Sequence, residues 1–254
     1  MTAILTRRAL VGGLAAGAGT LLAGCDRLGR NAQFRALLGT GEAGNYNLQR
    51  LLQDRTALAE EFTPNQRSPI FRSNGTRLPG GDAYARHIAT QFADWRLVVD
   101  GAVARPQAYG LDQLRAMPAR SQITRHDCVE GWSAIARWTG VPLKLLLDRA
   151  GVSAQARYIV FHCADPQSNG TPYYESIDRI DAIHPQTILA WGINDGPLPV
   201  QNGAPLRLRV ERQLGYKHAK YVQRIEAVTT LAGIYGGNGG TWEDLAGYEW
   251  YAGA

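Results

Sequence analysis

Glycine and proline interrupt this chain at short intervals, and this feature limits its possible folds more than any other. The 254 residues include 29 glycines and 12 prolines, and both residue types mark turns. The apolar stretches between them are mostly too short for long helices, and several are rich in the β-branched and aromatic residues of strands. We therefore expect an α+β domain with mixed, mostly antiparallel sheets and short helices.

The expected elements follow from local periodicity. A helix is expected over Asp82–Ala93, a second over Pro142–Arg149, which begins with proline and has Gly151 after its end, and a helical turn near Leu111. Residues 26–80 show only scattered helical spacing and end in a loop over Pro64–Gly81, and residues 194–197 form a turn. The expected strands are Arg96–Val99, Ser121–Arg125, Tyr158–Phe161, Ile188–Trp191, Leu206–Val210 and Tyr221–Val228.

The N-terminus has the pattern of an export signal. Arg7 and Arg8 precede an apolar run, Ala9–Ala23, that is too short and too weakly hydrophobic for a good membrane-spanning helix. The paired arginines are typical of twin-arginine export. The residues that end in Cys25 are similar to a lipoprotein cleavage site, so we expect removal of residues 1–24 and lipidation of Cys25. An uncleaved N-terminus is the alternative.

The overall charge narrows the range of partners. A formal charge of +5 and a pI near 9.2 favour anionic partners in general, namely nucleic acid, anionic lipid or a phosphorylated cofactor. The chain has no run of lysine and arginine and no known nucleic-acid motif, so no nucleic-acid partner is expected.

A cysteine in the middle of the chain is the main chemical candidate. Cys128 follows an expected strand and enters a loop that contains Gly131, which suits a side chain that projects into a cleft. We expect Arg125 and His126 to lower the pKa of this thiol, because thiolate is the form that binds metals. An ordinary, partly buried thiol is the alternative. On cysteine number alone, a disulfide between Cys128 and Cys163 is also open.

Several long segments, in order, carry a resemblance to a known family. Residues 126–147 (HDCVEGWSAIARWTGVPLKLLL) resemble the metal-binding segment of the sulfite oxidase-type molybdopterin oxidoreductases. Within that superfamily, the chain is similar to the bacterial branch that includes the periplasmic methionine sulfoxide reductases. Residues 173–191, 196–222 and 239–253 continue the match. The resemblance covers the chain from about residue 70 onward.

The resemblance implies a fold, a cofactor and a set of binding residues. We expect the sulfite oxidase-type molybdopterin-binding fold as a single domain over 70–254, preceded by the signal peptide 1–24 and a tether and extension over 25–69. The implied cofactors are molybdenum and molybdopterin, with Cys128 as the molybdenum ligand, and this role argues against a disulfide. The implied pterin-binding residues are Asn74, Cys163, Asn202, Arg207, Lys217, His218, Ala219 and Lys220.

Each of these assignments has an alternative. The stretch around Lys217 and Lys220, taken alone, fits a solvated basic loop better than a cofactor site. Asn74 also fits a plain Asn-Gly turn, and Cys163 also fits an inert buried thiol. Glu175 and the acidic residues after it are expected on a solvated face or at a helix cap.

The substrate is less defined than the cofactor. Arg125, His126 and Asp127 are candidates for substrate contact or proton delivery, and we expect His126 to titrate near neutral pH. The His-Asp pair before Cys128 departs from the methionine sulfoxide reductase branch, which leaves the substrate and the direction of catalysis open. Glu130 and Trp132 stand where sulfite oxidases carry an arginine, which disfavours sulfite. The expected activity is a two-electron oxidoreduction, with oxygen-atom transfer to or from a small molecule or a protein sulfoxide.

The sequence also bears on the oligomeric state, the electron carrier and the location of the protein. Neither a haem-binding segment nor an Ig-like dimerisation domain is recognisable, so we expect a monomer that uses a separate electron carrier, a membrane haem protein or a cytochrome. Its expected place is the periplasmic face of the cytoplasmic membrane. Two other functions stay open: a non-catalytic lipoprotein that binds a pterin or a partner, and a zinc site at His126, Cys128, His162 and Cys163, whose spacing matches no common zinc motif.

Overall fold

The computed structural model describes residues 31–166 and 170–253. The chain divides into two compact units, Met1–Gln53 and Asp54–Ala254. The expected export signal and Cys25 lie outside the described residues, so their assignment stays a prediction.

The described part of the first unit is one helix, α2 (Ala32–Leu52). The Asn31 side chain accepts hydrogen bonds from the backbone N–H groups of Gln33 and Phe34 at 2.9 and 3.1 Å, which caps the free donors of the first turn. The sequence indicated only scattered helical spacing here, because Gly39, Gly41 and Gly44 weaken the pattern. Among the described residues, none of the helices has both the length and the apolar character that crossing a membrane requires.

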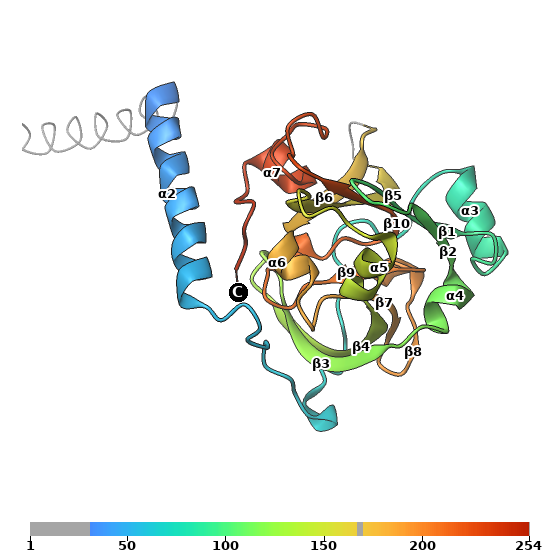
Figure 1. Ribbon diagram of the computed structural model, residues 1–254. Helices are drawn as coiled ribbons and strands as arrows, with labels where there is room; N and C mark the ends of the chain where they lie inside the picture. The colour runs from blue at the N-terminus through green and yellow to red at the C-terminus, as the bar shows by residue number, and fades with distance from the viewer. Residues whose placement is uncertain (1–30, 167–169, 254) are drawn as a thin grey trace, which may run out of the picture. The chain divides into compact units, whose positions relative to one another are not determined.

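The second unit contains two sheets (Figure 1). The first has the order β2-β1-β10-β5-β6, with β1 and β10 parallel and all other neighbours antiparallel. The second has the order β3-β4-β7-β8, with β9 paired to β7, and is antiparallel throughout. The strand bounds are β1 Arg96–Gly101, β2 Gln107–Gly110, β3 Arg120–Asp127, β4 Ser133–Pro142, β5 Tyr158–Pro166, β6 Pro172–Asp178, β7 Ile188–Ile193, β8 Gly196–Pro197, β9 Arg207–Arg209 and β10 Val222–Val228.

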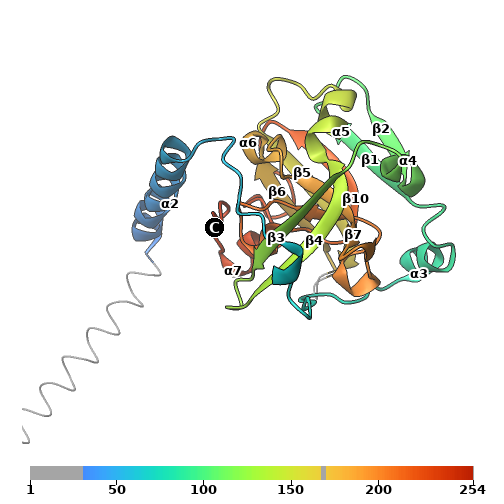
Figure 2. The same cartoon turned by 90° about the horizontal axis from the view of Figure 1, so that it is seen from below.

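Short helices connect these strands. Figure 2 shows β3 and β4 side by side as a long pair, with α5 beyond the end of β4. The helix bounds are η1 Pro64–Gln66, α3 Asp82–Ala89, α4 Leu111–Arg115, α5 Leu143–Ala150, α6 Arg179–Ala182, η2 Val200–Asn202, η3 Gly215–Lys217 and α7 Thr241–Ala246. The mixed, mostly antiparallel α+β architecture expected from the sequence is therefore confirmed.

The main hydrophobic core draws on both sheets. Leu97, Phe161 and Ile225 come from the first sheet, and Leu189 and Leu208 from the second, and each of these side chains is fully buried. Burial of large apolar side chains from both sheets is the main stabilising contribution in such a unit. It also fixes the ends of β3 and β9, which carry the candidate site.

The structure differs from the expected elements in several places. Helix α3 ends at Ala89, four residues early, because Gln91 and Phe92 take positive φ values of 51° and 64° that no α-helix contains. Helix α5 ends as expected, with Gly151 in the left-handed region at φ 66°. Strands β2, β4 and β6 were not predicted, since their sequences are short or mix small and charged residues.

Residues 54–69, assigned above to the tether, are joined to the folded unit. Phe62 N–H donates to the Ile123 carbonyl at 2.8 Å. The Gln186 side chain both accepts from Ala59 N–H at 2.7 Å and donates to the Ala59 carbonyl at 2.9 Å. This segment therefore lies along β3, the strand that leads to Cys128.

Candidate functional site

Cys128 lies in the tight loop between β3 and β4. The last β3–β4 pair is Asp127 with Ser133. Cys128 N–H donates to the Trp132 carbonyl at 2.9 Å, and Gly131, at φ 83°, donates to the Cys128 carbonyl at 3.0 Å. The thiol is 6% exposed and lines a pocket of about 200 Å³.

The pocket brings together six parts of the chain. They are the loop after Ser73, the Cys128 loop, the end of β5 with the start of β6, strand β9, the segment around η3, and the segment around α7. The lining residues are Asn74, Gly75, Thr76, Cys128, Val129, Glu130, Asp165, Tyr173, Arg207, Gly215, Tyr216, His218, Lys220, Trp242 and Tyr248.

Lys220 holds the first of these loops in place. Its Nζ donates to the carbonyls of Asn74 at 2.8 Å and Gln201 at 3.0 Å, and also to that of Thr76. The loop in turn places Asn74 Nδ2 3.4 Å from Cys128 Sγ, where it donates a weak hydrogen bond. Burial and the charge of Arg207 lower the pKa of Lys220 to about 7.

The expected activation of Cys128 by its neighbours is wrong. Burial raises the pKa of the Cys128 thiol, and the hydrogen bond from Asn74 only partly offsets this effect. Arg125 is half exposed and pairs with Asp127 at 2.9 Å, and neither residue lines the pocket. The flanking charges therefore contribute little to the site.

The expected titration of His126 near neutral pH is also wrong. The ring is 1% exposed, and its Nδ1 accepts a hydrogen bond from Arg209 Nη1 at 2.9 Å. Burial, followed by the charges of Arg209 and Arg207, lowers the pKa of His126 well below 6.5. His126 is thus a neutral ring behind Cys128, 5.0 Å from the ring of His218.

Several buried polar atoms around the pocket have no hydrogen-bond partner in the described part of the chain, which is uncommon in a native interior. They are Asp165 Oδ1, Asn202 Nδ2, Arg207 Nε and His218 Nδ1. Arg207 is otherwise fixed, since it donates to the carbonyls of Asn202 at 3.0 Å and His218 at 3.3 Å. A carboxylate and several donors left free beside one thiol suit a polar, anionic ligand that also brings a metal.

Asp165 is a pocket residue that the sequence analysis missed. Burial raises the pKa of Asp165 to about 6, against the opposing effect of Lys220. Its only sequence signal is an Asp-Pro pair after an expected strand, which also reads as a turn. Tyr173, Tyr216, Trp242 and Tyr248 were missed as site residues too, although they lie within the segments that carry the resemblance.

Four expected cofactor residues do not line the pocket: Asn202, which is buried beside Arg207, and Lys217, Ala219 and Cys163. The Lys217 ammonium is fully buried between Glu175 and Glu243, at 2.5 Å from each. Ala219 is 1% exposed and Cys163 is 5% exposed, and both belong to the hydrophobic core. Cys128 and Cys163 are free thiols. The expectation of a solvated Glu175 is wrong, because its carboxylate is the buried partner of Lys217.

The zinc alternative finds no support in the geometry. Across residues 31–166 and 170–253, no three histidine, cysteine or acidic side chains gather closely enough to hold a metal ion. His162 instead contacts Glu226 at 2.9 Å and Tyr235 at 3.2 Å, on the first sheet.

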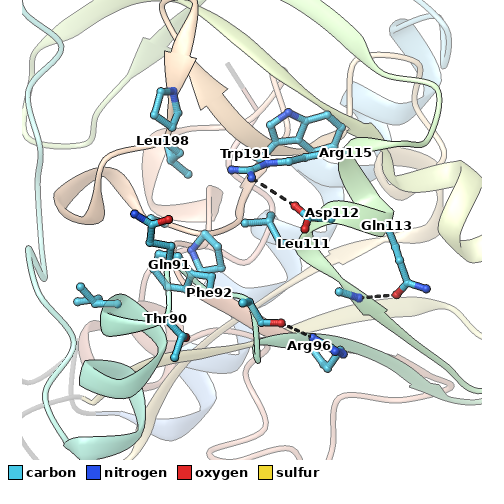
Figure 3. Close-up of a pocket in the computed structure, with 16 residues that line it drawn as sticks. Thr90, Gln91, Phe92, Arg96, Leu111, Asp112, Gln113, Arg115, Trp191 and Leu198 are labelled. Carbon is cyan, nitrogen blue, oxygen red and sulfur yellow. Dashed lines mark hydrogen bonds and ion pairs between the residues drawn. The ribbon is translucent and has the colours of Figure 1, made fainter.

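A larger hollow of about 670 Å³ lies between α3, α4 and the β7–β8 hairpin (Figure 3). Trp191 and Leu198 form part of its wall, and Arg115 lies 3.6 Å from Asp112 at its rim. None of its lining side chains has a buried polar atom without a partner within the described residues. The buried polar atoms without a partner therefore favour the smaller pocket at Cys128 as the functional site.

Comparisons with known proteins show the family to which the chain is similar. Residues 85–233 match the family model described as oxidoreductase molybdopterin binding domain. A protein of Azospira oryzae, named putative protein-methionine-sulfoxide reductase subunit YedZ1, is 40% identical over 199 residues, which cover 76% of this chain and 70% of that protein. The protein-methionine-sulfoxide reductase catalytic subunits MsrP of Xanthomonas campestris and Xanthomonas axonopodis are 37% and 36% identical.

The coverage of these relatives is unequal. The match to each MsrP covers 63% of this chain and 51% of the relative, so the chain spans about half the length of those proteins. Among solved structures, the sulfane dehydrogenase SoxCD of Paracoccus pantotrophus aligns with a TM-score of 0.49 and 22% identity, over 54% of this chain and 39% of that one. The family match confirms the expected fold, and the chain belongs to the sulfite oxidase-type oxidoreductases that bind molybdenum through molybdopterin.

Proposed function

We propose that this oxidoreductase reduces sulfoxides, with methionine sulfoxide as its substrate and Cys128 as the molybdenum ligand. The observation that carries the proposal is the buried thiol beside Asn74 in a pocket with unpartnered polar atoms. The relatives reported above are named as methionine sulfoxide reductase subunits, which supports this substrate.

The residues present fit the cofactor. Cys128 supplies a soft sulfur for the metal. Arg207 and Lys220 offer positive charge for a phosphorylated pterin, and Asp165 and the free Nδ1 of His218 offer acceptors for ring N–H groups. When bound, the cofactor supplies two-electron chemistry at a metal that exchanges an oxygen atom with the substrate.

The charge at the mouth of the pocket favours a neutral substrate. Glu130 lines the pocket and accepts a hydrogen bond from Trp132 Nε1 at 3.0 Å, which orients its carboxylate. A carboxylate at this place repels sulfite but not a sulfoxide. Val129 and Trp242, 46% and 39% exposed, offer apolar contact to a methyl and thioether group.

Proton supply must match electron supply, because reduction of a sulfoxide to a sulfide and water consumes two electrons and two protons. Asp165 and Lys220 have pKa values of about 6 and about 7, so both can hold or release a proton near neutral pH. His126 is neutral and its Nδ1 is occupied by Arg209, so it does not provide this proton.

We also propose where the enzyme is located and how it receives electrons. Export through residues 1–24 and lipidation of Cys25 would place the enzyme at the periplasmic face of the cytoplasmic membrane. The electrons would then come from a separate haem protein or cytochrome. A monomer is sufficient for all the residues named above, since one chain supplies them.

A dye-coupled assay tests the activity. Protein matured in a molybdopterin-producing host is supplied with a reduced dye and offered methionine sulfoxide, a trimethylamine N-oxide control or, with an oxidised dye, sulfite. We expect dye oxidation and methionine formation with methionine sulfoxide only. Turnover of sulfite, or cofactor-loaded protein with no turnover of any sulfoxide, contradicts the proposal. The second result would indicate a non-catalytic pterin-binding protein.

A further inference from the structure

A second hollow lies next to the Cys128 pocket, since helix α7 lines both. It has a volume of about 250 Å³, close to the size of one large side chain, and is lined by Thr171, Tyr174, Tyr235, Gly236, Thr241, Asp244 and Leu245. Helix α7 contributes to both hollows, with Trp242 in the Cys128 pocket and Thr241, Asp244 and Leu245 in the second one.

The walls of the second hollow are apolar and aromatic. The rings of Tyr174 and Tyr235 lie 4.4 Å apart between centroids, with a tilt of 36°. Asp244 is the only charged lining residue, and its carboxylate is already engaged by Tyr174 Oη and by the backbone N–H groups of Gly236 and Asn238, the last two at 3.0 Å. The hollow therefore suits an apolar or aromatic side chain rather than an ion.

Exposed apolar side chains lie at both hollows. Val129 and Trp242 are 46% and 39% exposed at the Cys128 pocket, and Tyr235 and Leu245 are 43% and 54% exposed at the second hollow. Trp242 and Leu245 are three residues apart on α7 and so are neighbours on the helix surface, and exposed apolar side chains that gather in this way mark binding sites on soluble proteins. Free methionine sulfoxide needs only the Cys128 pocket and would leave the side chains around the second hollow without a contact.

We propose that the Tyr174–Tyr235–Leu245 hollow is a subsite for an apolar side chain of a polypeptide substrate whose oxidised methionine enters the Cys128 pocket. This inference rests on the proposed sulfoxide reduction. Neighbouring faces of one helix lie on the order of 10 Å apart, and an extended peptide covers roughly 3.3 Å per residue. The side chain in the subsite is therefore two to four residues from the sulfoxide.

A peptide series tests the subsite with the holoenzyme and a reduced dye. Each peptide carries one methionine sulfoxide and one leucine placed two, three or four residues away on either side, and a reference peptide has serine throughout. We expect one leucine position to lower KM about tenfold, the effect of burying most of one leucine side chain, with kcat unchanged. Equal KM values for all peptides overturn the inference.

Three variants locate the effect. Leu245→Ser removes an exposed side chain at little cost to folding and is expected to abolish the preference for leucine while free methionine sulfoxide is reduced as before. Ile183→Ser, at another exposed apolar residue (41%) just after α6, is the matched control and is expected to keep the preference. Leu245→Lys is expected to favour a peptide with glutamate at the same position.

The outcomes separate the two proposals. If no sulfoxide is reduced, the proposed function fails. If free methionine sulfoxide is reduced normally but Leu245→Ser leaves the peptide preference intact, only the subsite fails. If Leu245→Ser instead slows turnover of the free sulfoxide with a haem-protein electron donor but not with the dye, the surface binds the electron carrier, and the subsite assignment is overturned.

Discussion

Asn74 Nδ2 donates a hydrogen bond of 3.4 Å to Sγ of Cys128, from a position 54 residues earlier in the chain. Lys220, from a third segment, holds the backbone of Asn74 through its carbonyl at 2.8 Å. The thiol therefore lies in a pre-arranged setting that does not depend on its immediate neighbours. The surroundings of Cys128 thus depend on the contacts of Asn74 and Lys220 more than on the residues that flank Cys128.

Lys220→Met removes the ammonium that three backbone carbonyls share. Because these buried acceptors lose their donor, we expect a loss of about 2–4 kcal/mol in unfolding free energy and a lower molybdenum content. Urea unfolding and metal analysis measure the two effects. Lys144→Met, at a residue whose side chain is 54% exposed, is the control and should change stability by less than about 0.5 kcal/mol. Equal effects of both variants would refute the role of Lys220.

Asp165 makes the stability of cofactor-free protein depend on pH. Its pKa in the folded chain, about 6, lies above the ordinary 3.8, so the folded state binds this proton more tightly than the unfolded state. The resulting stabilisation is present below about pH 4 and is lost as the pH rises through about 6, with a total of roughly 3 kcal/mol. Asp165→Asn should thus stabilise the protein more at pH 7.5 than at pH 4.5, as judged by urea unfolding. A gain that is the same at both values speaks against a buried, proton-binding Asp165.

Gly215 lies against the ring of His126. A Cβ atom added at this residue would be 2.5 Å from Nε2 and 2.7 Å from Cε1 of the ring, which is closer than atoms pack. We expect Gly215→Ala to cost about 1–3 kcal/mol and to reduce pterin retention, because the ring and η3 must separate. Gly80→Ala, which has no atom within 4 Å of the added Cβ, is the matched control. Thermal melts of both variants, with pterin extraction, give the comparison, and normal retention in Gly215→Ala counts against the close contact.

The buried group of Lys217, Glu175 and Glu243 has two carboxylates for one ammonium. Burial raises the pKa of Glu175 well above 4.5, in spite of Lys217. Since two acids share one ammonium and burial disfavours a charge on Glu175, we expect Glu175→Gln to change stability by less than about 1 kcal/mol, whereas Lys217→Met leaves both buried acids without their cation and costs about 3–5 kcal/mol. Chemical unfolding at pH 7 distinguishes the two variants, and a Glu175→Gln loss as large as that of Lys217→Met would contradict the view that one ammonium needs only one of the two charges.

The sequence predicted the fold class and most strands, because turn residues and short apolar runs are local signals. It predicted Cys128, Asn74, Arg207, His218 and Lys220 as site residues through resemblance, and the structure brings all five to one pocket. The local reasoning about charge next to Cys128 failed. Arg125 turns outward to Asp127, and His126 is buried against Arg209, which lies 83 residues further along the chain.

What the sequence did not predict depends on distant partners. Glu175 was expected in solvent because its partner Lys217 is 42 residues away, and no local pattern links them. Asp165 gave no signal beyond an Asp-Pro pair, since its role depends on an unpartnered oxygen facing a pocket built by other segments. Strand β4 was missed because alanine, glycine and arginine alternate with its few large apolar residues.

The bond between Cys128 and molybdenum is the central claim, and the metal-to-protein ratio of purified holoprotein tests it most directly. Cys163→Ala, at the other free thiol of the described chain, is the control and should retain its molybdenum. We predict that Cys128→Ala, produced in the same host, loses at least about nine tenths of the metal and the absorption bands of the thiolate-bound centre. A Cys128→Ala protein with a full complement of molybdenum and an unchanged spectrum would contradict the account.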